Sequence, residues 1–246
     1  MNQRSTPGGV LLVAVSAAAF GLMPLFAKLA YSAGTGTYTL LFLRFTAAAV
    51  FMFALLLLRK LPLPSRREIA AFLLLGGVGY VGQSFCYFTA LNYASSSVVS
   101  LLLYTYPALV MLGSALVFRK RITARKLLSL ALALAGALLI IGTGFQADFR
   151  GILLALGSAL CYTVYILVSS RVIPQGMGVQ SSAFIMLGAA AVYGVLTGLL
   201  GFAPPREPRG FTAVAMIALV STVLAFWAFF TGMERTGPTA ASLVST

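Results

Sequence analysis

Blocks of roughly twenty apolar residues, separated by short polar segments, run along the whole chain. A helix of that length crosses a hydrocarbon core about 30 Å thick, so each block predicts one transmembrane helix. The predicted helices span residues 9–29, 38–58, 69–91, 98–118, 127–144, 151–169, 181–201 and 211–233. A further block begins at Thr239, close to the last residue, Thr246. The first block exceeds the seven to fifteen apolar residues of a signal-peptide core, so we expect a retained helix.

The composition agrees with a chain that is embedded in lipid. Hydrophobic residues make up 60% of the chain and charged residues 9%, with a mean hydropathy of +1.00. Soluble domains carry about a quarter charged residues, so an aqueous globular domain is excluded. A net charge of +13 would suggest a nucleic-acid partner in a soluble protein. Here most basic residues lie between apolar blocks, and we expect the lipid bilayer as partner and no nucleic acid.

Basic residues predict the orientation of the chain. With a cytoplasmic amino terminus, the inner segments of the first five blocks contain ten basic residues, and the outer loops at 30–37 and 92–97 contain none. The ten are Arg4, Arg59, Lys60, Arg66, Arg67, Arg119, Lys120, Arg121, Arg125 and Lys126. Cytoplasmic loops of membrane proteins are enriched in Lys and Arg. The second half is less decisive, with three basic residues outside and two inside. We therefore expect a multi-pass protein of the cell (inner) membrane with a cytoplasmic amino terminus.

The two halves of the chain match each other without gaps at one constant shift in residue number. This shift, the repeat offset, aligns Gly9 with Gly151. Residues 9–12 (GVLL) fall on 151–154 (GILL), residues 47–50 (AAAV) on 189–192 (AAAV), and Pro62 on Pro204. Single matches between apolar helices are common by chance, whereas one offset that holds through helices and loops indicates a duplication. We predict a first unit at residues 1–146 and a second unit at residues 147–246.

Each repeat unit has an odd number of predicted helices, which decides its orientation. A five-helix unit ends on the opposite side of the membrane from its start, so the second unit must be inverted relative to the first. Inverted repeats occur in many secondary transporters, with a site near the midplane where the halves meet. The fifth helix of the first unit has no counterpart after Thr246. We expect a complete protein to extend to about 287 residues and to have ten helices.

Polar side chains recur at helical spacing inside three blocks. On one face of a helix lie Tyr80, Gln83, Ser84 and Tyr87; the sixth block repeats the pattern with Ser158, Tyr162, Tyr165 and Ser169, and the fourth with Ser97, Ser100 and Tyr104. Such residues face a water-filled cavity or hydrogen-bond neighbouring helices. We expect the set to line a shared cavity. Pro107 lies within the fourth block and favours a kink, either as a fixed bend or as a flexing point.

Two cations lie within apolar blocks. Arg44 is the seventh residue of its block, and Lys28 lies in the last turn of the preceding one. Either residue could attract an anionic group such as a substrate carboxylate, or extend to the outer phosphates of the bilayer. The second interpretation suits Lys28 better; for Arg44 both remain open.

The chain lacks the residues of most catalytic and metal centres. It contains no histidine, and its two cysteines, Cys86 and Cys161, lie inside apolar blocks without a zinc or disulfide spacing. We therefore expect no cofactor, no metal and no enzymatic activity.

Several short segments resemble the drug/metabolite transporter superfamily, in its EamA branch. They are residues 26–28 (FAK), 43–45 (LRF), 90–96 (ALNYASS), 104–107 (YTYP), 122–126 (ITARK) and 232–238 (GMERTGP). Their order and spacing extend the resemblance over the whole chain. It implies two inverted five-helix repeats, cytoplasmic termini and export of small metabolites, often amino acids or related compounds. The chain departs at Lys120, where many relatives carry an acidic residue.

The sequence thus predicts a secondary transporter that moves a small metabolite, an amino acid or related compound, outward by alternating access. A channel-like facilitator is the closer alternative, and a membrane-embedded enzyme or a sensor the more distant ones. The substrate, the coupling ion and homodimer formation stay open. The candidate substrate-binding residues are Lys28, Arg44, Tyr80, Gln83, Ser84, Tyr87, Tyr104, Pro107, Ser158, Tyr162 and Tyr165.

Overall fold

The structure, a computed structural model, describes residues 7–118, residue 131 and residues 148–236. These residues form helices joined by short loops, without a strand among them. Seven helical spans within them are long and apolar enough to cross a membrane. They are Pro7–Ser32, Thr37–Leu58, Arg66–Ala90, Ser96–Gly113, Phe149–Val172, Gly178–Leu200 and Pro208–Phe229. Each corresponds to a predicted block; apart from residue 131, the predicted helix at 127–144 lies outside the described residues, and so does the block from Thr239.

Several spans consist of consecutive helical elements. The first half contains α1 (Pro7–Gly21), α2 (Met23–Ser32), α3 (Thr37–Leu58), α4 (Arg66–Leu74), the π-helical segment η1 (Leu75–Tyr80), α5 (Val81–Ala90), α6 (Ser96–Leu103) and α7 (Tyr106–Phe118). The second half contains α9 (Phe149–Val172), α10 (Gly178–Leu200), α11 (Pro208–Ala218), the π-helical segment η2 (Leu219–Leu224) and α12 (Ala225–Thr236). The third span of each half therefore has the same order: α-helix, π-helical segment, α-helix.

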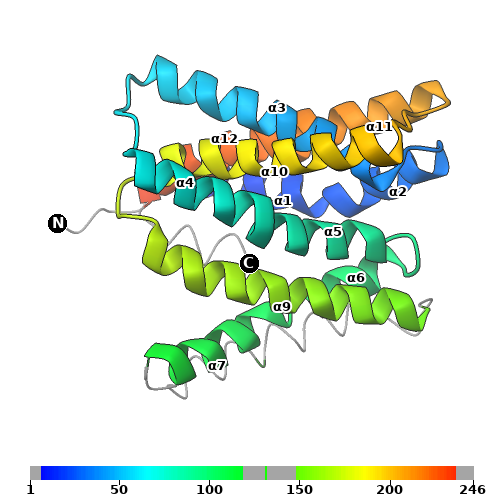
Figure 1. The fold of residues 1–246 in the computed structure, drawn as a ribbon, viewed down its shortest axis with the longest axis horizontal. Helices are drawn as coiled ribbons and strands as arrows, with labels where there is room; N and C mark the ends of the chain where they lie inside the picture. The colour runs from blue at the N-terminus through cyan, green and yellow to red at the C-terminus, as the bar shows by residue number, and fades with distance from the viewer. Residues whose placement is uncertain (1–6, 119–130, 132–147, 237–246) are drawn as a thin grey trace.

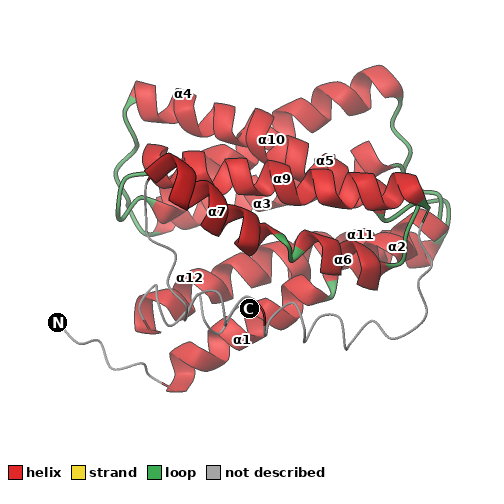
Figure 2. Cartoon of the chain, turned by 90° about the horizontal axis from the view of Figure 1, so that it is seen from below, coloured by secondary structure: helices red, strands yellow, loops and turns green. Residues whose placement is uncertain are grey.

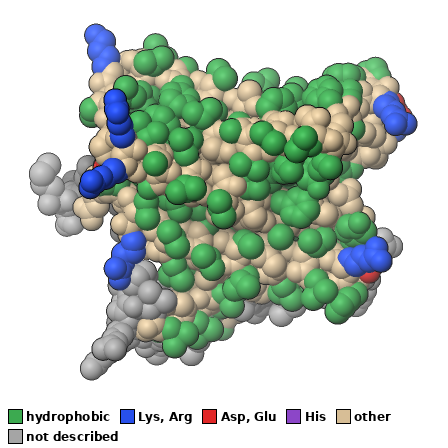
Figure 3. Space-filling view, viewed as in Figure 1, with side chains coloured by type: hydrophobic (Ala, Val, Ile, Leu, Met, Phe, Trp, Pro, Cys, Tyr) green, Lys and Arg blue, Asp and Glu red, His purple; other side chains and the backbone are tan. Residues whose placement is uncertain are grey.

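Loops and charges gather at the two ends of the bundle. The helices run from one end to the other (Figure 1), and most connections lie at these ends (Figure 2). Lys and Arg side chains cluster there, while the visible face between them is rich in hydrophobic side chains (Figure 3). Large apolar residues such as Leu58, Leu116 and Leu199 are about four-fifths exposed. An exposed apolar surface of this kind suits a bilayer rather than water.

The fourth span is interrupted near its middle. α6 ends at Leu103 and α7 begins at Tyr106, with Pro107 as its second residue. The break lies between the two ends of the bundle (Figure 2). Proline has no backbone N–H to donate to the carbonyl four residues earlier, and next to the break the Thr105 hydroxyl donates to the Leu102 carbonyl (2.7 Å). The break agrees with the kink expected at this proline.

The second spans of the two halves, α3 and α10, pack against each other in opposite directions. At one end of the bundle, the Gly36 N–H before α3 donates to the Ala203 carbonyl after α10 (3.0 Å). At the other end, the Gln180 side-chain amide at the start of α10 donates to the Pro62 carbonyl after α3 (3.5 Å). The loop between α3 and α4 and the loop between α10 and α11 thus lie at opposite ends.

Several structural details recur at the repeat offset. The buried Ser16 hydroxyl of α1 donates to the Ala225 carbonyl of α12 (2.8 Å), and the buried Ser158 hydroxyl of α9 donates to the Gln83 carbonyl of α5 (3.1 Å). The offset carries Ser16 onto Ser158 and Gln83 onto Ala225, so the two bonds are equivalent. Gly34 and Gly176, which follow the first span of each half, both adopt φ 85, a left-handed conformation that glycine adopts without steric cost.

Candidate functional site

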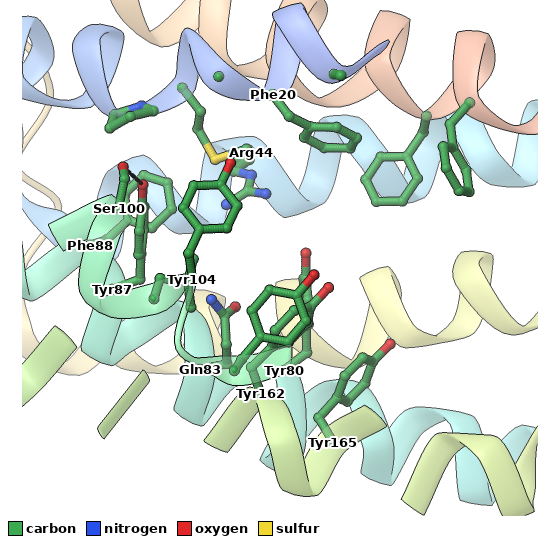
Figure 4. Close-up of a pocket in the computed structure, with 18 of the residues that line it drawn as sticks. Phe20, Arg44, Tyr80, Gln83, Tyr87, Phe88, Ser100, Tyr104, Tyr162 and Tyr165 are labelled. Atoms are coloured by element: carbon green, nitrogen blue, oxygen red, sulfur yellow. Dashed lines mark hydrogen bonds between the residues drawn. The ribbon is translucent and has the colours of Figure 1, made fainter. Parts of the chain in front are cut away.

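A cavity of about 430 Å³ lies inside the bundle between the two halves (Figure 4). Residues from both halves line it: Ala17, Phe20, Gly21, Met23, Pro24, Arg44, Tyr80, Gln83, Tyr87, Phe88, Ser100, Leu103, Tyr104, Tyr106, Tyr162, Tyr165, Ser182, Ile185, Met186, Phe226 and Phe229. Its volume lies within the range of roughly 300–1,000 Å³ that is usual for small-molecule sites.

Arg44 is the only charged residue in the cavity wall among the described residues. Its side chain is 3% exposed, and its Nε donates to the Thr222 hydroxyl of η2 (3.2 Å). The guanidinium carbon lies 4.9 Å from the ring centre of Phe45 and 5.2 Å from that of Phe88. No described carboxylate forms an ion pair with it. Buried charges in proteins are normally paired, so Arg44 presents a cation that an anionic ligand can neutralise.

Tyrosine rings form one wall of the cavity. Tyr106 and Tyr162 pack edge to face at 4.7 Å, Tyr162 and Tyr165 stack at 6.0 Å, and Tyr80 meets Tyr165 at 5.3 Å. The Tyr87 hydroxyl is 3.2 Å from that of Ser100. The close-up shows the Tyr80, Tyr162 and Tyr165 side chains across the cavity from Phe20 (Figure 4). The wall combines apolar ring faces with hydroxyl groups, which suits a ligand with both polar and aromatic character.

Equivalent positions of the two halves both contribute to the cavity wall. Four pairs related by the repeat offset line it: Arg44 with Met186, Tyr87 with Phe229, Phe20 with Tyr162, and Met23 with Tyr165. In each pair one residue is polar and the other is apolar. The polar members lie on α3, α5 and α9, and the apolar members on α1, α2, α10 and α12. The cavity is therefore amphipathic, with a polar side and an apolar side.

Seven of the eleven candidate residues lie in the cavity wall: Arg44, Tyr80, Gln83, Tyr87, Tyr104, Tyr162 and Tyr165. Gln83 and Tyr87 of α5, Tyr80 of η1, and Tyr162 and Tyr165 of α9 line the same cavity. Their contact with a substrate stays a prediction.

The other four candidates, Lys28, Ser84, Pro107 and Ser158, lie outside the wall. Lys28 is partly exposed on α2, and Pro107 follows the wall residue Tyr106. The Ser84 hydroxyl bonds to the Tyr80 carbonyl (2.7 Å) and the Tyr193 hydroxyl (2.9 Å). The Ser158 hydroxyl accepts from the Gln83 amide (3.3 Å) and is fully buried between α5 and α9. Both serines thus join helices, the alternative that hydroxyl groups in membrane helices allow.

The cavity wall also contains apolar residues that helical spacing of polar side chains does not predict, such as Phe20, Met186, Phe226 and Phe229. In an apolar helix, the apolar residues that face a cavity cannot be distinguished by sequence from those that face lipid or other helices. The repeat itself held a usable signal, since its offset carries Arg44 to Met186, Tyr87 to Phe229 and Tyr162 back to Phe20. The described residues contain no group of three or more His, Cys, Asp or Glu suited to a metal ion.

Membrane-length helices around an amphipathic cavity that contains Arg44 define a multi-pass membrane protein. The model of the EamA-like transporter family matches residues 7–142 and again residues 149–246. The chain therefore belongs to the EamA-like transporter family, within the drug/metabolite transporter superfamily, and is a membrane transporter.

Individual relatives agree with this assignment. The chain is 25% identical to the uncharacterized transporter YcbK of Bacillus subtilis over 98% of the chain and 82% of that protein. It is 29% identical to the aromatic amino acid exporter YddG of Ancylobacter novellus, over 64% of the chain and 56% of that protein. A solved crystal structure matches 99% of this chain and 89% of its own with a TM-score of 0.69 at 21% identity, which shows a shared fold.

Proposed function

We propose that the protein is a secondary transporter of the cell membrane that exports a small amphipathic carboxylate, an amino acid or related compound, by alternating access. The observation that carries this proposal is Arg44, a buried cation without a carboxylate partner among the described residues, in an amphipathic cavity between the two halves. A carboxylate bound at Arg44 leaves the apolar part of the same molecule to pack against side chains such as Phe226 and Phe229.

The arrangement of the helices supports alternating access. The antiparallel packing of α3 on α10 and the recurrence of the Ser16 and Ser158 hydrogen bonds are what an inverted repeat of two units, 1–146 and 147–246, requires. Two oppositely oriented units around one midplane site can rock against each other and expose the site to either side. The π-helical segments η1 and η2 adjoin the cavity through Tyr80 and through Thr222, which holds Arg44.

The distribution of basic residues supports the orientation of the protein in the cell membrane, and a named relative supports the outward direction of transport. Arg59, Lys60, Arg66 and Arg67 flank the loop between α3 and α4, which favours a cytoplasmic position for that loop and for the amino terminus. The opposite end carries Arg206 and Arg209, the latter paired with Glu207. The relative named as an aromatic amino acid exporter favours outward transport of a related compound.

Transport by purified protein in liposomes tests the proposal. The wild type is expected to take up labelled phenylalanine or labelled phenylpropionate in a saturable manner. Arg44→Ala should lower uptake roughly a hundredfold or more, because it removes the only cation in the described wall. Lys28→Ala, which changes a cation outside the wall, serves as the matched control. Unchanged uptake by a folded Arg44→Ala protein contradicts the proposal, and uptake that does not saturate indicates a channel.

A further inference from the structure

We infer that the site selects carboxylates without an ammonium group, compounds of net charge −1, over the zwitterionic amino acids of the same skeleton. This inference rests on the proposed function and narrows its substrate class. It follows from the charges that surround Arg44, which provide for an anionic group and not for a cationic one.

Among the side chains that the structure describes, no carboxylate is placed to receive an ammonium group. Glu68 caps the start of α4 through Ser65, Asp148 caps the start of α9, and Glu207 pairs with Arg209 before α11. All three lie at helix ends, whereas the described cavity wall contains Arg44 and no acidic residue. The position equivalent to Arg44 in the second half is Met186, which adds no charge.

The sum of charges in the occupied site favours a monoanion. Arg44 with a bound carboxylate of net charge −1 is neutral. Arg44 with a bound zwitterion keeps a net charge of +1 in a cavity from which the ligand displaces water. An uncompensated buried cation is costly, and two like charges a few ångströms apart repel each other strongly at low dielectric constant.

The aromatic rings near Arg44 do not compensate for this charge. In an α-amino acid the ammonium group lies one carbon from the carboxylate, so a carboxylate on Arg44 brings the ammonium close to the guanidinium. The rings there, Phe45 and Phe88, already contact the Arg44 cation at 4.9 and 5.2 Å. The ring faces next to the guanidinium are therefore already occupied by the Arg44 cation.

Matched pairs of ligands test the inference. In liposomes that contain the purified protein, phenylpropionate and phenylalanine, and likewise hydroxyphenylpropionate and tyrosine, are compared as competitors of labelled phenylpropionate uptake. The compounds without the ammonium group should compete at concentrations roughly tenfold or more below those of the amino acids. Equal or better competition by the amino acids overturns the inference.

A variant separates the charge effect from the shape of the cavity. Arg44→Gln retains a side chain that can donate to Thr222 but removes the cation, so the ratio of the dissociation constants of the paired compounds, measured by direct binding to the purified variant, should fall to about one. A ratio that stays the same in Arg44→Gln overturns the inference. If neither compound of a pair is bound by the wild type, the proposed function itself fails. If phenylalanine is bound better and the binding requires Arg44, only the present inference fails.

Discussion

The position of Arg44 depends on a residue from the other half of the molecule. Its Nε donates to Thr222, whose own hydroxyl donates to the Ile217 carbonyl five residues earlier (2.8 Å) in the π-helical turn. The hydroxyl of Thr222 is thus held in place, and it fixes the guanidinium across the interface between the halves. Removal of this acceptor leaves a buried N–H without a partner.

We therefore expect Thr222→Val to raise the concentration of unlabelled phenylpropionate that inhibits uptake of labelled phenylpropionate roughly three- to tenfold. This change corresponds to about 1 kcal/mol. Valine keeps the volume of threonine, so the packing should remain. Thr212→Val removes an exposed hydroxyl of α11 that donates to the Pro208 carbonyl, and is the matched control. The measurement is the inhibition constant, with the melting temperature recorded beside it. Equal inhibition constants for Thr222→Val and wild type argue against a positioning role.

At the residue scale the sequence predicted the polar side of the site and missed the apolar side. Tyr80, Gln83 and Tyr87 follow helical spacing, and the structure places them in one wall. Ser84 shares that spacing, yet its short side chain bonds to a backbone carbonyl and to Tyr193. Spacing gives the face of a helix, whereas the length and the hydrogen-bond partner of a side chain decide whether it reaches the cavity.

At the scale of helices, the same helix–helix interface occurs twice between the two halves of the repeat, with a different number of side-chain hydrogen bonds. α1 packs on α12 through the Ser16 hydrogen bond, and α9 packs on α5 through the equivalent bond of Ser158. Ser158 also accepts from the Gln83 amide, whereas the position equivalent to Gln83 is Ala225. The interface between α5 and α9 therefore contains one more side-chain hydrogen bond than its counterpart at these positions.

This difference predicts unequal effects of two equivalent substitutions. Ser16→Ala should destabilise the protein by about 0.5–1 kcal/mol, and Ser158→Ala by about 1–2 kcal/mol, because Ser158→Ala removes two hydrogen bonds and takes the acceptor away from the buried Gln83 side-chain amide. Ser170→Ala, which alters an exposed hydroxyl of α9, should change little. Unfolding in detergent mixtures gives the free energies. A larger loss for Ser16→Ala than for Ser158→Ala would refute this assignment of the two interfaces.

Helix positions were predictable, and helix irregularities were only partly so. Each described span corresponds to a block of apolar residues, since the thickness of a bilayer sets the block length. Pro107 indicated the break between α6 and α7 because a proline cannot donate to the preceding turn. Nothing comparable marked η1 and η2, since a π-helical turn depends on how the span packs against its neighbours.

At the scale of the whole molecule, alternating access requires two halves of opposite orientation around the Arg44 cavity. The repeat offset and the odd number of helices in each unit predicted this arrangement from the sequence. The amphipathic cavity lies between these halves, and each of its four pairs of equivalent wall positions combines a polar residue with an apolar one. Which member of each pair is polar is set by the individual residues and could not be derived from the repeat alone.

Labelling of single cysteines tests this orientation most directly. In a protein with Cys86 and Cys161 replaced by alanine, Leu63→Cys places a thiol between α3 and α4, and Phe202→Cys places one between α10 and α11; both positions are more than half exposed. Intact cells are treated with a membrane-impermeant maleimide before and after permeabilisation. The account predicts that the Phe202→Cys protein reacts in intact cells and the Leu63→Cys protein only after permeabilisation. Reaction of both proteins from the same side would contradict it.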